Sequence, residues 1–248
     1  MVLPRTNQVG APWLSRSVTP GSAAQMARSR TASVSLLAAS SMATSIALAV
    51  APIGHDGSMR VVLVRHGETA WSRAGRHTGR TDLPLLDEGV RQAEAVGVRL
   101  RAFTFAQVWC SPLTRARETC RHAGLGDHAI YEPDLIEWDY GDYEGRRTVD
   151  IHRERPGWDL MSEGVPHGEH FEDVAARAER VIERFPVDAD VAVFAHGHLL
   201  RVLTARWLGL GHAVGRALLL SPCTVSILGR DRGAPVIALW NDAGHLTG

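Results

Sequence analysis

Two continuous apolar runs, each leading to a histidine-glycine pair, constrain the fold of this chain more than any other feature. The first run, Arg60–Val64, leads into Arg65-His66-Gly67, and the second, Asp190–Gly197, ends on such a pair itself. Runs without polar alternation are typical of strands buried on both faces, as the strands of parallel sheets are. Because ligands bind beyond the carboxyl ends of such strands, we expect both histidines at one edge of the sheet.

Segments with helical spacing separate the predicted strands. Val90, Ala93 and Leu100 recur at helical spacing, and Ser111-Pro112 predicts an N-cap and first residue for the next helix. The predicted helices are Asp87–Ala102, Pro112 to about His122, Phe171–Phe185 and His198–Leu208; the other predicted strands are Ala106–Cys110, Thr224–Leu228 and Val236–Trp240. This alternation predicts an α/β fold, a three-layer α/β/α sandwich with a mostly parallel central sheet.

The composition narrows the chemistry. The 248 residues carry a formal net charge of +0, which favours neither nucleic acid nor an acidic membrane as a partner. Every basic residue other than histidine is an arginine, so a cation that grips phosphate must be a guanidinium. Cys110, Cys120 and Cys223 match no zinc motif and are expected to be reduced core thiols.

Residues 1–58 differ in composition from the rest, with four arginines, one aspartate and no glutamate. The weakly apolar run Ser33–Val50 is marginal for a membrane span, and no stable membrane association is expected. Residues 26–49 have the layout of a secretory signal peptide, and the composition also fits a transit peptide. We favour a disordered extension before Met59, which predicts a cytoplasmic protein with one catalytic domain over residues 59–248; a working signal peptide would make it secreted.

Two histidines and two arginines are expected to meet at the carboxyl edge of the sheet. Arg65 and His66 follow the first strand, Arg115 lies in the helix after the strand at Ala106–Cys110, and His196 follows the later apolar run. Guanidinium groups bind phosphate oxygens bidentately, and a neutral imidazole is a good nucleophile. The sequence therefore predicts a pocket in which a phosphoryl group is transferred onto a histidine.

Five blocks of sequence stand in order along residues 59–240. They are Arg65–Thr69, His77–Gly89, Ser111–Thr119, Leu135–Gly145 and Phe194–His198. In this order they resemble the histidine phosphatase superfamily, the phosphoglycerate mutase-like group, and imply its fold. The second and fourth blocks look most like those of small acid phosphatases and sedoheptulose 1,7-bisphosphatase-like members.

The resemblance assigns a role to each matching position. It implies that His66 accepts the phosphate, and that Glu137 protonates the leaving oxygen and then activates water. The implied phosphate-binding residues are Arg65, Ser72, Thr78, Gly79, Arg115 and His196. Of these, Ser72 stands where many family members have asparagine.

Neighbouring residues offer competing assignments. Arg117 lies two positions after Arg115, about 200° around a helix, so both cannot face one pocket, and the resemblance selects Arg115. Most of the acidic residues near Glu137, namely Asp139, Asp142 and Glu144, are expected to lie in a solvated loop. Glu169 is expected to organise the site rather than to react, and His77 to lie at the pocket edge.

These features predict a phosphatase that hydrolyses small phosphomonoesters, such as sugar phosphates, through a phosphohistidine and without metal or cofactor. The expected partner is therefore a small phosphorylated metabolite; the sequence makes no prediction about oligomeric state. The alternative is a phosphotransferase of the phosphoglycerate mutase type. Mutases of the family carry a long insertion after the acid, whereas only 30 residues separate Glu137 from Gly168 here, which favours access of water and hydrolysis.

Overall fold

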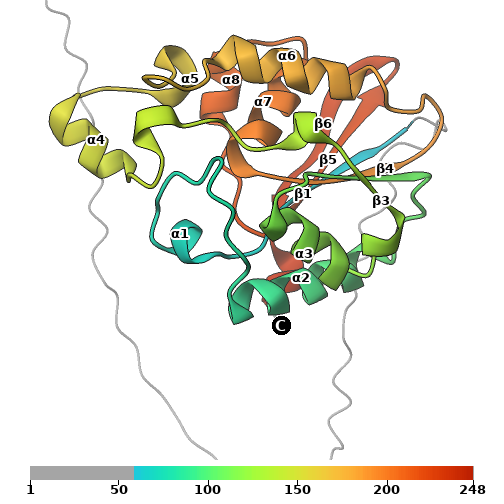
Figure 1. Ribbon diagram of the computed structural model, residues 1–248. Coiled ribbons are helices and arrows are strands. Elements are labelled where there is room, and N and C mark those ends of the chain that lie inside the picture. The colour runs from blue at the N-terminus through green and yellow to red at the C-terminus, as the bar shows by residue number, and fades with distance from the viewer. Residues whose placement is uncertain (1–58, 248) are drawn as a thin grey trace, which may run out of the picture. The chain divides into compact units, whose positions relative to one another are not determined.

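The computed structural model describes residues 59–247, and a six-stranded sheet lies at their centre (Figure 1). In order across the sheet, the strands are β3 (Ala129–Tyr131), β2 (Gln107–Cys110), β4 (Val191–Ala195), β1 (Val61–Arg65), β5 (Val225–Asp231) and β6 (Ala234–Asp242). The first four are parallel to one another, and β5 pairs antiparallel with both β1 and β6. The predicted mostly parallel sheet is confirmed.

Helices cover both faces of this sheet, which confirms the predicted three-layer sandwich. Figure 1 shows α6 (Phe171–Ile182), α7 (Gly197–Trp207) and α8 (His212–Ala217) on one face, and α2 (Asp87–Leu100) and α3 (Thr114–His122) on the other. In β1, Val61 and Leu63 join the buried cluster beneath α6 and α7, while Val62 and Val64 join the cluster beneath α2 and α3. The strand is continuously apolar because each face packs against a core.

Short elements that the sequence did not predict complete the fold. They are the helices α1 (Ala70–Arg73), α4 (Thr148–Glu154), α5 (Leu160–Glu163) and α8, and the 3-10 turns η1 (Gly126–His128), η2 (Pro133–Leu135), η3 (Gly141–Tyr143) and η4 (Gly244–Leu246). In Figure 1, α1 and α4 lie beside one end of the sheet. Helices of one or two turns leave no clear period in the sequence, so they were missed, as was the three-residue strand β3.

The predicted start of α3 is wrong. The helix begins at Thr114 with Leu113 as its N-cap, and Ser111 gives it no cap hydrogen bond. Instead, the Asp82 carboxylate accepts hydrogen bonds from the backbone N–H and the hydroxyl of Thr114, both at 2.7 Å. Ser111 directs its hydroxyl toward His196. The cap therefore comes from a residue 32 positions away, which local sequence cannot reveal.

The register of the parallel strands sets the position of the site. Arg65 at the end of β1 pairs with Ala195 at the end of β4, and Cys110 at the end of β2 pairs with Phe194. Three strands thus end level with one another. The residues that follow them meet at one edge, as the sequence predicts.

The predictions made for residues 1–58 lie outside the described residues. Among the helices that the structure describes, none combines the length and the apolar character needed to cross a membrane.

Candidate active site

His66 is held as a neutral imidazole with one free ring nitrogen. Its Nδ1 lies 2.8 Å from the carbonyl oxygen of Gly67, which can only accept, so Nδ1 carries the hydrogen. Nε2 forms no hydrogen bond with any described residue. Burial, followed by the charges of Arg115 and Arg65, lowers the pKa of His66 well below 6.5. The unprotonated Nε2 is therefore available as a nucleophile near neutral pH.

His196 and Arg115 form a buried pair behind the nucleophile. Arg115 donates from Nε to His196 Nδ1 at 3.1 Å, so the hydrogen on neutral His196 is at Nε2 and is donated to Ser111 Oγ at 2.7 Å. The His196 ring lies 5.2 Å from the His66 ring, centroid to centroid. Both side chains are fully buried, and neither lines the cleft at His66.

Arg115 holds the loop that precedes α2. Its guanidinium donates to the carbonyls of Thr78, Gly79 and Thr81 at 2.9–3.0 Å. Arg117, two residues later, is exposed and places its guanidinium 5.3 Å from the ring centroid of Tyr131. The two arginines thus differ in exposure: Arg115 is buried behind His66, whereas Arg117 is on the surface.

Arg65 lines the cleft and carries a buried N–H that has no partner among the described residues. Its Nη1 donates to the Leu220 carbonyl at 2.5 Å, whereas its Nε is buried without a partner among the described residues. Burial lowers the pKa of Arg65, and the nearby Glu137 carboxylate opposes that shift. The guanidinium packs against Gly197 at the start of α7. A buried N–H without a partner beside a nucleophile is suited to an anion.

Glu137 lies at the amino end of α7. Its Oε1 accepts from the backbone N–H groups of Trp138 and Leu199 at 2.9 Å, and its Oε2 accepts from that of His198 at 3.1 Å. The first N–H groups of a helix lack partners within the helix and carry partial positive charge, which suits a carboxylate. The same side chain lines the cleft at His66, within reach of a group bound there.

The segment that carries Glu137 is fixed by an ion pair with little exposure. Arg177 in α6 binds both carboxylate oxygens of Glu169 at 2.9 and 3.0 Å, and donates to the carbonyls of Asp134 and Ile136 at 2.8 Å. A further bond reaches the carbonyl of Glu137 at 3.4 Å. These contacts support the expectation that Glu169 organises the site, and they add Arg177, which the sequence reasoning missed.

Ser72, Thr78 and Gly79 lie near the nucleophile, but each has a structural task. The Ser72 hydroxyl accepts a hydrogen bond from the backbone N–H of Thr69, the N-cap residue of α1. The Thr78 hydroxyl donates to the Arg76 carbonyl at 3.2 Å. The Gly79 N–H is 2.9 Å from a carboxylate oxygen of Glu144. Ser72 and Thr78 line the cleft whereas Gly79 does not, and their proposed contacts with phosphate stay predictions.

Glu144 shows that the expectation of a solvated acidic loop is wrong at this position. Its carboxylate is partly buried and accepts hydrogen bonds from the backbone of Gly79 and of Thr81, the latter at 3.0 Å. No sequence signal marked this residue, because its partners are backbone groups more than 60 positions away. It binds the loop after α1 to the segment that bears Glu137.

The cleft over His66 has a volume of about 190 Å³. Beyond the predicted residues it is lined by Arg76, His77, Tyr140, His198, Arg201 and Leu220. The position of His77 agrees with the expectation for that residue, and burial lowers its pKa to about 4. In residues 59–247, no group of three or more metal-binding side chains is arranged to hold a metal ion.

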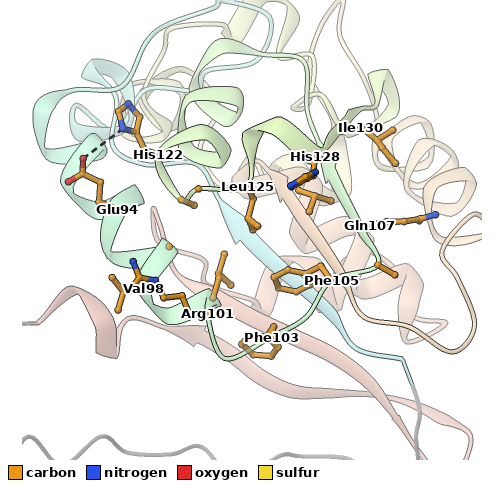
Figure 2. Close-up of a pocket in the computed structure, with 16 residues that line it drawn as sticks. Glu94, Val98, Arg101, Phe103, Phe105, Gln107, His122, Leu125, His128 and Ile130 are labelled. Carbon is orange, nitrogen blue, oxygen red and sulfur yellow. Dashed lines mark ion pairs between the residues drawn. The ribbon is translucent and has the colours of Figure 1, made fainter.

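A larger cavity of about 880 Å³ lies elsewhere, at the ends of α2 and α3 and the start of β2 (Figure 2). Phe103, Phe105 and Leu125 line it, and an ion pair between Glu94 and His122 stands at its rim. β2 begins at this cavity and ends at the catalytic edge of the sheet. None of the predicted site residues lines the larger cavity, so its size does not make it the reaction site.

Comparison with known proteins agrees with this geometry. Residues 61–243 match the family described as the histidine phosphatase superfamily (branch 1). An acid phosphatase of Mycobacterium tuberculosis is 37% identical over 75% of this chain and 94% of its own length. The sedoheptulose 1,7-bisphosphatase of Saccharomyces cerevisiae is 34% identical over 61% of this chain and 68% of its own length.

Other similarities extend the range of named activities. A probable phosphoglycerate mutase of Erwinia tasmaniensis is 30% identical over 76% of this chain and 95% of its own length. The solved structure of an open reading frame product from Mycobacterium tuberculosis superposes with a TM-score of 0.71, at 37% identity, over 75% of this chain and 99% of that one. With a free histidine nitrogen, an arginine and a carboxylate around one cleft, and a family match spanning the whole sheet, the chain belongs to the histidine phosphatase superfamily, branch 1.

Proposed function

We propose that the protein hydrolyses small phosphomonoesters through a phosphohistidine intermediate on His66. The observation that carries the proposal is a free Nε2 on His66 in the same cleft as the guanidinium group of Arg65. The first is a nucleophile, and the second is a donor for a phosphate oxygen. Phosphatases among the similar proteins support the same activity.

The reaction takes place in two in-line steps. In the first, His66 Nε2 forms a bond to phosphorus while the bond to the ester oxygen breaks, and Glu137, which must be protonated when substrate binds, gives its proton to that oxygen. In the second, Glu137 takes a proton from water as the water oxygen bonds to phosphorus and the P–N bond breaks. One carboxyl group is enough, because the first step leaves Glu137 as a carboxylate and the second step requires a carboxylate as its base.

Positive charge around the phosphoryl group stabilises both transition states. Arg65 provides it directly from the cleft wall. Arg115 acts from beneath His66, where four of its five N–H groups bind His196 and the carbonyls of the preceding loop. His196 holds Arg115 and packs near the nucleophile, so we assign it to the same anion site.

Hydrolysis is favoured over the mutase alternative by the segment between Glu137 and Gly168. This segment forms only the short elements η3, α4 and α5, and so small a lid leaves the phosphohistidine open to water. We further propose a reaction without metal or cofactor, a catalytic unit within residues 59–248, and a cytoplasmic location.

A panel of phosphate esters with EDTA present tests the proposal. The panel holds 3-phosphoglycerate, fructose bisphosphate, sedoheptulose bisphosphate and phenyl phosphate, and inorganic phosphate is measured for the wild type, His66→Ala and His128→Ala. His128 is an exposed histidine away from the cleft and serves as the matched control. We expect release of phosphate that is lost only in His66→Ala.

Three outcomes would contradict the proposal. Undiminished turnover in His66→Ala would exclude the phosphohistidine, and loss of activity in EDTA would exclude the metal-free reaction. Formation of 2-phosphoglycerate in place of inorganic phosphate would make the enzyme a mutase.

A further inference from the structure

His198 lies in the cleft wall, two residues after His196, and takes no part in the reaction steps above. Its backbone N–H binds the carboxylate of Glu137, and its side chain lines the cleft beside that residue. The Tyr140 hydroxyl lies 2.5 Å from its Nδ1. His198 is therefore fixed at both its backbone and its ring, next to the group that handles the leaving oxygen.

The direction of the hydrogen bond between Tyr140 and His198 follows from the surroundings. Burial raises the pKa of Tyr140 well above 10 and lowers the pKa of His198 well below 6.5, so both groups are neutral. The Tyr140 hydroxyl has no other partner among the described residues, and a buried phenol needs an acceptor for its hydrogen. The phenol therefore donates to Nδ1.

This direction fixes the tautomer of His198. A neutral imidazole carries one hydrogen, and since Nδ1 accepts, the hydrogen is on Nε2. Nε2 forms no hydrogen bond with a described residue. Since it is not one of the fully buried unpaired side-chain atoms of residues 59–247, part of it remains accessible. The result is an oriented N–H donor that the cleft leaves open for a bound molecule.

The substrate group that accepts a hydrogen bond from His198 Nε2 belongs to the alcohol half of the substrate. His66 and Arg65 hold the phosphoryl group, and Glu137 stands at the ester oxygen, so the next position outward carries the alcohol. A neutral N–H donor is satisfied by a hydroxyl oxygen and gains nothing from an unsubstituted aryl ring.

We propose that His198 is a specificity-determining residue that donates from Nε2 to a hydroxyl oxygen of the substrate's alcohol half, with Tyr140 as its positioning residue. The proposal rests on the proposed phosphatase function and narrows its substrates to polyhydroxylated phosphomonoesters. A site built to hydrogen-bond a substrate hydroxyl discriminates against analogues that lack it, because its polar group is then left unpaired.

Kinetics with ribose 5-phosphate and phenyl phosphate test the proposal. The first offers several hydroxyl groups beyond the ester, and the second offers none. We expect His198→Ala to lower kcat/KM for ribose 5-phosphate by about threefold to tenfold more than for phenyl phosphate, the range for loss of one neutral hydrogen bond. His128→Ala, the matched control, should change neither value.

Two conservative variants separate hydrogen bonding from packing. The amide of glutamine in His198→Gln reaches the position of Nε2 and should restore part of the preference for ribose 5-phosphate. The shorter amide in His198→Asn reaches only the position of Nδ1 and should not restore it. Tyr140→Phe should weaken the preference as well, because the ring is then no longer fixed.

Nitrogen NMR of His198 reads the tautomer without any turnover. The wild type should show a protonated Nε2 and an unprotonated Nδ1, and Tyr140→Phe should show a mixture of both tautomers. A protonated Nδ1 in the wild type would overturn the proposal, as would an equal loss for both substrates in His198→Ala. If the wild type hydrolyses phenyl phosphate but not ribose 5-phosphate, the inference fails alone; if it hydrolyses neither, the proposed function fails with it.

Discussion

Replacing Arg177 by methionine tests how the segment that bears Glu137 is held. The side chains of Arg177 and Glu169 are only 9% and 16% exposed. The substitution leaves the Glu169 carboxylate and the carbonyls of Asp134 and Ile136 without their donor. Breaking a buried ion pair by removing one partner costs about 3–5 kcal/mol, and the lower value applies because Glu169 retains contact with solvent.

A loss of about 3 kcal/mol lowers the Tm of a domain of this size by about 6–12 °C. Activity should fall as well, because displacement of Glu137 weakens proton transfer, whose complete loss lowers a rate by about 10²–10⁴-fold. We expect kcat of Arg177→Met to fall at least tenfold while KM changes little. Calorimetry and steady-state kinetics on a substrate from the panel measure both effects.

Arg180 provides the matched control, since it lies one turn later in α6 and pairs with Asp134 at 2.7 Å. Its side chain is 55% exposed, and exposed pairs contribute about 0–1 kcal/mol. Arg180→Met should therefore lower Tm by only a few degrees at most and leave kcat unchanged. Equal effects of the two substitutions, or an Arg177→Met enzyme with unchanged Tm and kcat, would refute the reasoning.

Two other predictions concern the anion site. Because burial and two arginines lower the pKa of His66 well below 6.5, its imidazole should remain neutral as pH falls through 6.5, and an NMR titration with a midpoint near 6.5 would contradict this. Arg115→Gln should abolish phosphate release while Arg117→Gln, two residues along the same helix, retains wild-type turnover; comparable losses in both variants would show that the assignment of Arg115 is wrong.

The residues that follow strand ends could be predicted from the sequence. His66 and His196 are found this way because buried parallel strands are apolar along their whole length, so the first polar residue after each marks the edge of the sheet. The two central helices α2 and α7 were likewise placed within two residues of their observed ends. In each case the signal lies within one element.

Residues whose partners are distant backbone groups could not be predicted. Arg177 looks like one polar residue in an amphipathic helix until its carbonyl partners, about 40 positions earlier, fold against it. Glu144 looks like part of an acidic loop until it receives the N–H of Gly79. The Ser111 hydroxyl was assigned to a helix cap because its partner, His196, lies 85 positions later in the chain.

The adjacency of β1 and β4 also bears on how the protein acquires its activity. The register pairs Val61 with Val191, so two strands that lie 130 positions apart in the sequence must pair before His66 and His196 are neighbours. Closing a loop of this length is entropically unfavourable, and pairings so distant in sequence form slowly. Recovery of turnover during refolding should therefore follow the appearance of helical structure, and chain fragments that end before β4 should be inactive even where their helices form. Recovery of turnover during refolding therefore marks the end of long-range strand pairing rather than its beginning.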